Sequence, residues 1–235
     1  MDLFPGQTFS WDACVDLLDA FEESYATVRG PDGRSWCGGG WRIWPPLVFP
    51  VAPDCIRLAD YVDALPDAPG AHLVILLQAG AASLGRFAGG EEVATKSLKK
   101  YVVRGSGRAQ PTHLETKGKS RYGSRLRLQN ARRLLQEVNE RLCAWDDELG
   151  PVELVFHASV PRLWADLLAT RPAPPFVSMR KDDSDAEVEG ARRSATPPLF
   201  VHIPRDVERP TTEVLRRVYR SLTHGRVEAD AAPPG

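Results

Sequence analysis

The apolar segment HLVILLQ, residues 72–78, most narrows the range of folds open to this chain. Five consecutive apolar residues between His72 and Gln78 match the length of one β-strand and are far too few for a membrane span. A strand that is apolar on both faces needs cover on both faces, which is typical of a central strand in an α/β sheet. We therefore expect a β-sheet flanked by helices, with this strand near its middle.

Strand-like and helix-like patterns alternate along the rest of the chain, and no internal repeat is evident. This alternation predicts an α/β domain built around a mixed β-sheet. Ser10 is a candidate N-cap for the first helix, and Gly225 is a candidate stop for the last one. Predicted strands cover 46–52, 72–78, 83–90, 91–104, 152–158 and 198–204, and predicted helices cover 10–28, 122–145, 160–169 and 209–225.

The last residues, ADAAPPG at 229–235, are predicted to be a disordered tail. Three consecutive glycines lie between Trp36 and Trp44, where a tight turn would let tryptophans close over a core edge. A phosphate-binding loop would need a following Lys-Ser/Thr pair and a helix, and the sequence has neither.

The four cysteines and five histidines do not suggest a metal site. The cysteines lie far apart without a CxxC pair, and the histidines have no paired spacing, so no ligand set for structural zinc is expected. We interpret the thiols as buried or idle in a reducing cytoplasm. The N-terminus lacks a basic region followed by an apolar one, so neither secretion nor a membrane location is expected.

Positive charge is concentrated in one segment. Residues 96–133 contain twelve lysines and arginines and a single acid, Glu115, whereas the rest of the chain has 18 basic and 30 acidic residues. Concentrated charge of one sign costs self-repulsion and suits an anionic partner. A merely solvated basic surface is the alternative on composition alone. Nine cations surround the centre of the segment: Lys99, Lys100, Arg104, Arg108, Lys117, Lys119, Arg121, Arg125 and Arg127.

Residues 105–120 form a predicted loop between a strand and a long helix, with Gln110 near its centre. Gly105 and Gly107 give the backbone freedom, and Pro111 restricts it directly after the glutamine. An amide side chain donates and accepts hydrogen bonds, so Gln110 can position a water molecule or a sugar hydroxyl. Cations around it would hold phosphates without reading a base sequence.

At these residues the sequence resembles the Vms-like release factor (VLRF) family, relatives of the middle domain of eukaryotic and archaeal class I release factors. The family's YxxR lead-in matches Tyr101 and Arg104, and its GGQ-like loop matches 107–110. A small-residue turn that enters a helix follows at Ser120, Gly123, Leu126 and Arg127, and Asn139-Glu140 falls inside that helix with a structural role. RPTTEVLRRVYRSLT, 209–223, is similar to the family's closing helix, so the resemblance spans about 70–225.

The resemblance implies a release-factor middle-domain-like (RNase H-like) core and a compact bacterial form. Residues 71–228 would be the catalytic domain, which carries the GGQ-like loop 105–120, and residues 1–70 would be an N-terminal extension that packs on this core. The tripeptide here is Arg108-Ala109-Gln110 rather than Gly-Gly-Gln, so loop flexibility must come from Gly105, Gly107 and Gly123. It further implies a cytoplasmic ribosome-associated quality-control factor that frees stalled nascent chains from peptidyl-tRNA on the large ribosomal subunit. Gln110 would act without a metal or other cofactor, either in ester hydrolysis or in endonucleolytic cleavage of the tRNA 3′ end.

Several residues near Gln110 have alternative roles. His113 can act as a general base at neutral pH, contact RNA, or simply be exposed. Tyr101 can stack on a base or pack at a strand end. Arg104 and Arg125 are the predicted phosphate contacts closest to the chemistry. Arg132 and Arg133 are predicted to point outward from the helix.

Two other functional classes remain. A non-catalytic ribosome- or tRNA-binding module would need the same cations, and replacement of Gln110 by alanine would then leave its function intact. A stand-alone RNase H-like nuclease is disfavoured, because such an enzyme needs clustered carboxylates for two metal ions. The acids of this sequence avoid the basic segment.

Overall fold

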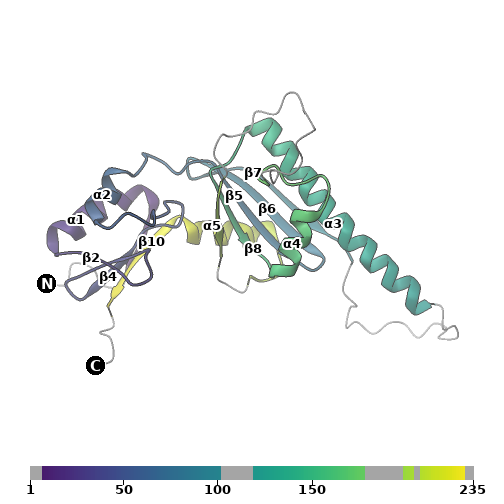
Figure 1. Cartoon of the computed structure of the whole chain (residues 1–235), viewed down its shortest axis with the longest axis horizontal. Helices are drawn as coiled ribbons and strands as arrows, with labels where there is room; N and C mark the ends of the chain where they lie inside the picture. The colour runs from purple at the N-terminus through teal and green to yellow at the C-terminus, as the bar shows by residue number, and fades with distance from the viewer. Residues whose placement is uncertain (1–6, 102–118, 178–197, 204–206, 231–235) are drawn as a thin grey trace. The chain divides into compact units, whose positions relative to one another are not determined.

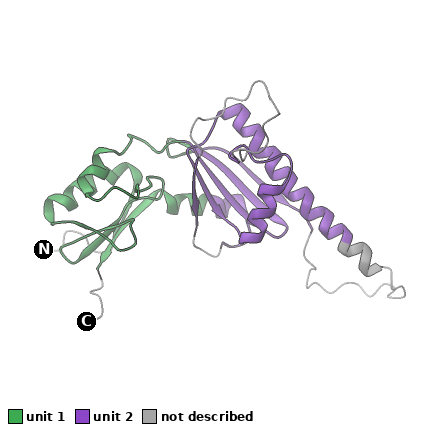
Figure 2. Cartoon of the chain, viewed as in Figure 1, with its two compact units in different colours: residues 1–70, 88–91, 216–235 green, residues 71–87, 92–215 purple. Residues whose placement is uncertain are grey.

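The computed structural model describes residues 7–101, 119–177, 198–203 and 207–230, and side chains within the long helix from residue 125 onward. The chain forms two compact units (Figures 1 and 2). The first unit comprises Met1–Gly70, Ala88–Glu91 and Arg216–Gly235, and the second comprises Ala71–Phe87 and Glu92–Leu215. The predicted division into an extension, a main domain and a tail stays a prediction.

A five-stranded mixed sheet forms the centre of the second unit, with the strand order β7-β6-β5-β8-β9. Strand β5 pairs antiparallel with β6 and parallel with β8, and β8 pairs parallel with β9. The predicted α/β fold is confirmed, and the apolar segment is its central strand. The strands are β5 (His72–Gln78), β6 (Ala81–Ala88), β7 (Glu91–Lys99), β8 (Leu154–Ala158) and β9 (Leu199–His202).

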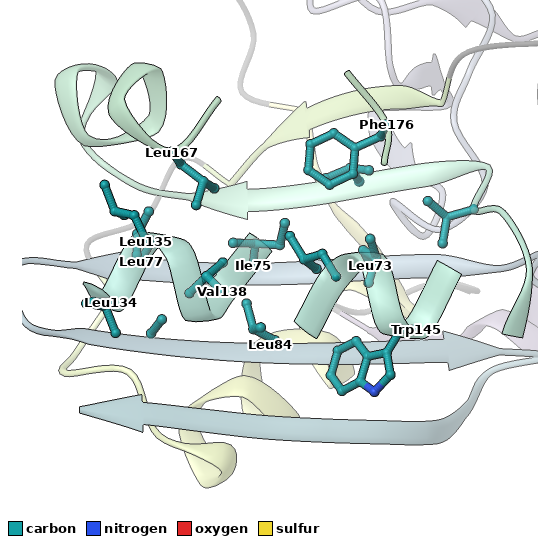
Figure 3. Packing of buried hydrophobic residues seen from close by; sticks show 14 residues of the cluster. Leu73, Ile75, Leu77, Leu84, Leu134, Leu135, Val138, Trp145, Leu167 and Phe176 are labelled. Atoms are coloured by element: carbon teal, nitrogen blue, oxygen red, sulfur yellow. The ribbon is translucent and has the colours of Figure 1, made fainter. Parts of the chain in front are cut away.

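Helices α3 (Lys119–Leu149) and α4 (Pro161–Ala169) cover one face of this sheet (Figures 1 and 3). Alternate residues of β5 point to this face, because successive side chains of a strand alternate between its two sides. They pack with β6, β8 and the two helices in one apolar cluster. Figure 3 labels Leu73, Ile75 and Leu77 of β5, Leu84 of β6, Leu134, Leu135, Val138 and Trp145 of α3, Leu167 of α4, and Phe176.

The opposite face of the sheet meets the first turn of α5 (Thr212–Leu222). A Cβ atom added to Gly85 would lie 2.7 Å from the Leu215 side chain, so only glycine permits this close approach. The hydroxyl of Ser97 in β7 lies 2.9 Å from that of Thr212. With cover on both sides, the apolar run of β5 needs no polar face, as expected for a central strand.

Two buried polar side chains fix the C-terminal ends of the helices. Arg86 is 3% exposed and donates hydrogen bonds to the carbonyls of Leu149 and Pro151, at 3.2 and 3.0 Å. Fully buried Asn139 donates to the carbonyls of Leu167 and Thr170, at 3.0 and 2.9 Å. The last carbonyls of a helix have no partner within the helix, so these bonds hold α3 and α4 on the sheet. The predicted structural role of Asn139 agrees with this position.

An antiparallel sheet forms the first unit, with the strand order β1-β10-β4-β3-β2. Gly39 and Gly40 have φ angles of 59° and 80°, which suit the two-residue turn between β3 and β4. Trp36 is fully buried beside this turn, so the predicted tight turn at a core edge is confirmed. The elements are β1 (Thr8–Ser10), 3-10 helix η1 (Trp11–Ala13), α1 (Cys14–Ser24), β2 (Val28–Arg29), β3 (Trp36–Gly38), β4 (Trp41–Trp44), α2 (Leu58–Asp63) and β10 (His224–Ala229).

Two details of the sequence interpretation were wrong in this unit. Residues 46–52 are not a strand: Val48 and Phe49 are buried within a turn, where the neighbouring prolines supply no donors for a ladder. Gly225 is not a helix stop, because α5 ends at Leu222 and Gly225 lies within β10, opposite Phe9. A Cβ atom at Gly225 would lie 2.2 Å from the Phe9 ring, so close packing requires the glycine.

His72, at the start of β5, is 1% exposed and packs edge-on against the Phe156 ring at 5.7 Å. Its Nδ1 has no hydrogen-bond partner among the described residues. Burial, with a smaller contribution from the positive charge of Arg86, lowers the pKa of His72 to about 4. The imidazole is therefore neutral in the folded protein at neutral pH.

The free energy of unfolding should fall at acidic pH, because buried His72 resists protonation in the folded protein. The unfolded chain binds a proton near pH 6.5, whereas the folded chain does so only near its pKa of about 4. The stability from neutral His72 is thus fully present above pH 6.5 and is lost as pH falls toward 4, by about 1.4 kcal/mol per pH unit at most. Urea unfolding measured from pH 7 to 4.5 should give a flatter profile for His72→Met than for the wild type. Equal slopes would contradict this prediction.

Candidate nucleic-acid interface

The N-terminal half of α3 extends beyond the packed part of the second unit (Figure 1). Among the described side chains of α3, the first buried one is Leu134, and those from Arg125 to Arg133 are exposed or half-buried. Even Leu126 and Leu128 are 38% and 56% exposed. Lys119 lies fifteen residues before Leu134, which corresponds to about 22 Å of helix. We call residues 119–133 the stalk.

The stalk is cationic along its length. Arg132 and Arg133 are exposed, as predicted, and Arg125 is exposed too. Arg127 is half-buried and interacts with other groups of the protein. The first turn of α3 contains no acidic residue, and the partial positive charge of a helix N-terminus adds to that of the basic residues. The helix dipole and the arginine side chains therefore favour the same kind of ligand, an anion.

The chain reaches the stalk from the end of β7, where three predicted RNA-binding residues lie. Lys99 is exposed, and Tyr101 is 59% exposed. The Lys100 ammonium lies 2.6 Å from a carboxylate oxygen of Glu137 on α3. The Lys100 side chain is still 29% exposed. Lys100 therefore already has an anionic partner within the protein, whereas the Lys99 side chain is exposed to solvent.

Two residues that the sequence interpretation did not identify hold this strand end. Asn130 donates a hydrogen bond from Nδ2 to the Tyr101 carbonyl at 2.8 Å, and Glu137 pairs with Lys100. They are seven residues apart, two helical turns, so both lie on one face of α3. That spacing was visible in the sequence, but nothing in the sequence indicated that this face meets the end of β7.

Seven of the fifteen predicted site residues of the segment fall outside the described part of the chain. For three others the structure gives only a helical backbone: Lys119, Arg121 and Gly123 all lie within α3. The predicted helix over 122–145 is confirmed and is longer at both ends. The residues outside the described ranges are Arg104, Gly105, Gly107, Arg108, Gln110, His113 and Lys117.

The described ranges contain neither a metal-binding group nor a membrane-spanning helix. No three His, Cys, Asp or Glu side chains in these ranges gather as a metal-binding group would. All four cysteines are free thiols. Burial raises the pKa of Cys14 to about 12, so that thiol stays protonated. In the same part of the chain, no helix has the length and apolar composition needed to cross a membrane.

Comparison with known proteins gives a family and a likeness to solved structures. The model of the family described as "Bacteroidetes VLRF1 release factor" matches residues 72–230. A solved structure titled "Vms1 mitochondrial localization core" is similar at 10% sequence identity and a TM-score of 0.46, over 95% of this chain and 84% of that chain. No curated protein matches the chain. The family match includes the whole cationic segment and covers well over half of the sequence, and the chain therefore belongs to the VLRF1 release factor family.

Proposed function

We propose that this protein is a cytoplasmic ribosome-associated quality-control factor, which frees stalled nascent chains from peptidyl-tRNA on the large ribosomal subunit. The observation that carries the proposal is the release factor family match across 72–230, a range that includes Gln110 and the stalk. A cationic helix that extends about 22 Å past the packed core supports it, because such a helix can enter an RNA-lined space too narrow for the whole unit. Residues 71–228 would form the catalytic domain.

Gln110 acts by position rather than by titration. Its amide accepts a hydrogen bond from a water molecule and donates one in return, which aligns the water oxygen with the ester carbonyl. The water oxygen bonds to the carbonyl carbon, and the ester bond to the tRNA ribose breaks. The ribose oxygen takes up a proton, and the peptide leaves with a free carboxylate. No metal ion is needed for this step, since the amide and the surrounding RNA supply the orientation.

The same amide serves the second reaction of the proposal. There it aligns a ribose hydroxyl with the adjacent phosphodiester. The hydroxyl oxygen bonds to phosphorus, the bond from phosphorus to the next nucleotide's oxygen breaks, and that oxygen is protonated. The nascent chain then leaves with a fragment of the tRNA 3′ end. Both reactions need the same parts, namely a positioned amide, cations that hold RNA, and separation from bulk water.

The cations of the stalk and the β7 end hold the RNA backbone. Lys99 and Arg125 are exposed and meet phosphates directly, and Arg127 adds positive charge to the same part of the helix. Tyr101, exposed at the end of β7, offers an aromatic face to an unpaired base. Lys119 and Arg121 contribute at the start of α3, with Arg104, Arg108, His113 and Lys117 closer to Gln110 along the chain.

The test is to map the product. Wild-type protein is incubated with stalled large subunits that carry peptidyl-tRNA, and the 3′ end of the released tRNA is sequenced. An intact CCA end identifies ester hydrolysis, and a shortened end identifies tRNA cleavage. EDTA should not change the rate, provided that magnesium-dependent ribosome integrity is controlled with a subunit-sedimentation assay. Binding without any product would instead assign the protein to the alternative class, a non-catalytic ribosome- or tRNA-binding module.

A further inference from the structure

Three bonds fasten the two residues that follow β7. The Lys100 backbone N–H donates to the Gly80 carbonyl at 2.9 Å, in the turn between β5 and β6. The Lys100 ammonium pairs with Glu137, and the Tyr101 carbonyl accepts from Asn130. β7 itself ends at Lys99, so these residues are held outside the strand ladder. We call the contacts of Asn130 and Glu137 with this strand end the clasp.

The clasp ties both ends of the segment 102–118 to one helix. Its first end follows Tyr101, which is held beside Asn130 in the middle of α3. Its second end is covalently joined to α3 at Lys119, eleven residues before Asn130, or about 16 Å along the helix axis. Both anchor points therefore belong to the same rigid element, and their separation cannot vary while the clasp is closed.

Opening the clasp would change the reach of the segment. Lys100 and Tyr101 would be free to leave α3, and two additional residues can add up to about 7 Å of chain before Gln110. Catalytic geometry tolerates much less, since a misplacement of about 1 Å can cost a hundredfold in rate. Affinity for RNA depends instead on the number of phosphate contacts, which an open clasp leaves in place.

We propose that Asn130 and Glu137 are positioning residues, which fix the start of the segment 102–118 on α3 so that Gln110 reaches the reacting bond. The inference rests on the proposed function, because it assigns the reaction to Gln110. It also gives Lys100 a specific role: its ammonium is the partner of Glu137 and not a main RNA contact. Neither Asn130 nor Glu137 needs to touch the substrate.

A charge swap separates these two roles of Lys100. Lys100→Glu breaks the ion pair and should lower the single-turnover release rate at saturating protein about tenfold. Lys100→Glu combined with Glu137→Lys restores an oppositely charged pair and should recover most of that rate. Asn130→Ala should also lower the rate about tenfold, with the half-saturating concentration within twofold of wild type. Gln136→Ala and Glu140→Lys, at exposed positions of the same helix outside the stalk, are matched controls that should keep the wild-type rate.

Hydrogen exchange at the Lys100 amide supplies a readout that does not depend on the chemistry. Exchange should be faster in Asn130→Ala and in Lys100→Glu, and return toward the wild-type rate in the swap. The inference is overturned if faster exchange leaves the release rate unchanged. It is also overturned if Lys100→Glu mainly raises the half-saturating concentration and the swap does not repair it, since Lys100 would then be an RNA contact. The proposed function is tested separately with Gln110→Ala. If that variant releases nascent chains at the wild-type rate, the proposed function is wrong, whatever the clasp variants show.

Discussion

Replacing Gln110 by alanine should lower the single-turnover rate of nascent-chain release by about 10²- to 10³-fold, while affinity for the stalled large subunit changes less than twofold. The rate falls because the amide acts in the transition state, where loss of one positioned hydrogen-bonding group typically costs this much. Affinity is retained because Gln110 carries no charge and makes no phosphate contact in the proposal. Release of labelled peptide from purified stalled complexes, at saturating protein, measures the rate.

Two further variants distinguish the need for the amide group of Gln110 from the need for its exact placement. Gln110→Glu keeps the size of the side chain but removes the N–H donor and adds a negative charge, so it should be nearly as slow as the alanine variant. Gln110→Asn keeps the amide but withdraws it by one methylene, and should be slow by at least tenfold because distance matters. A protein that releases chains at the wild-type rate with alanine at this position would not use the glutamine, and the binding-module alternative would then account for the cations.

Neutralising the stalk should weaken binding and leave the chemistry intact. Arg125→Gln with Arg127→Gln should raise the dissociation constant for the stalled subunit about 10- to 100-fold at physiological salt. The slope of log K against log salt should become shallower by about 1.4 to 1.8, since each of the two lost phosphate contacts removes roughly 0.7 to 0.9 from it. Once the variant is saturating, release should proceed within a few-fold of the wild-type rate.

The matched control removes two positive charges from a part of the protein outside the cationic segment. Arg162 on α4 and Arg220 on α5 are exposed and lie far from the cationic segment in sequence. Arg162→Gln with Arg220→Gln should leave both affinity and salt slope unchanged. Equal loss in the two double variants would mean that net charge, rather than the stalk, determines binding. Because Arg127 also interacts within the protein, thermal unfolding of each variant should be recorded alongside.

The sequence predicted correctly those helices and strands whose apolar residues follow one long, regular pattern. The apolar run of β5 left only a central strand as a plausible structure, and it occupies the middle of a mixed sheet. The helical pattern over 122–145 predicted α3, and the buried residues Leu135, Val138, Leu142 and Trp145 follow a helical period, whereas Leu128 is exposed. The concentration of cations before this helix identified a candidate interface, because charge composition needs no tertiary information.

The sequence did not predict β10 or the clasp, because both depend on contacts between residues that lie far apart in the chain. β10 contains a glycine and three charged or histidine side chains among six residues, so it looked like a helix end and not a strand. Its partners β1 and β4 lie about two hundred residues earlier, and no local pattern indicates that pairing. The clasp was missed for the same reason, since an asparagine and a glutamate on a polar helix face look like any solvated pair.

The central claim is that the stalk carries the Gln110 amide to the bond that holds the nascent chain. A cryo-electron microscopy structure of the Gln110→Ala variant, trapped on a stalled large subunit with intact peptidyl-tRNA, tests it most directly. We expect residue 110 within about 6 Å of the terminal tRNA ribose or the adjoining phosphodiester, with α3 continuous from Lys119 and the clasp closed. Residue 110 at the subunit surface, with the N-terminal end of α3 directed away from the tRNA, would contradict the account.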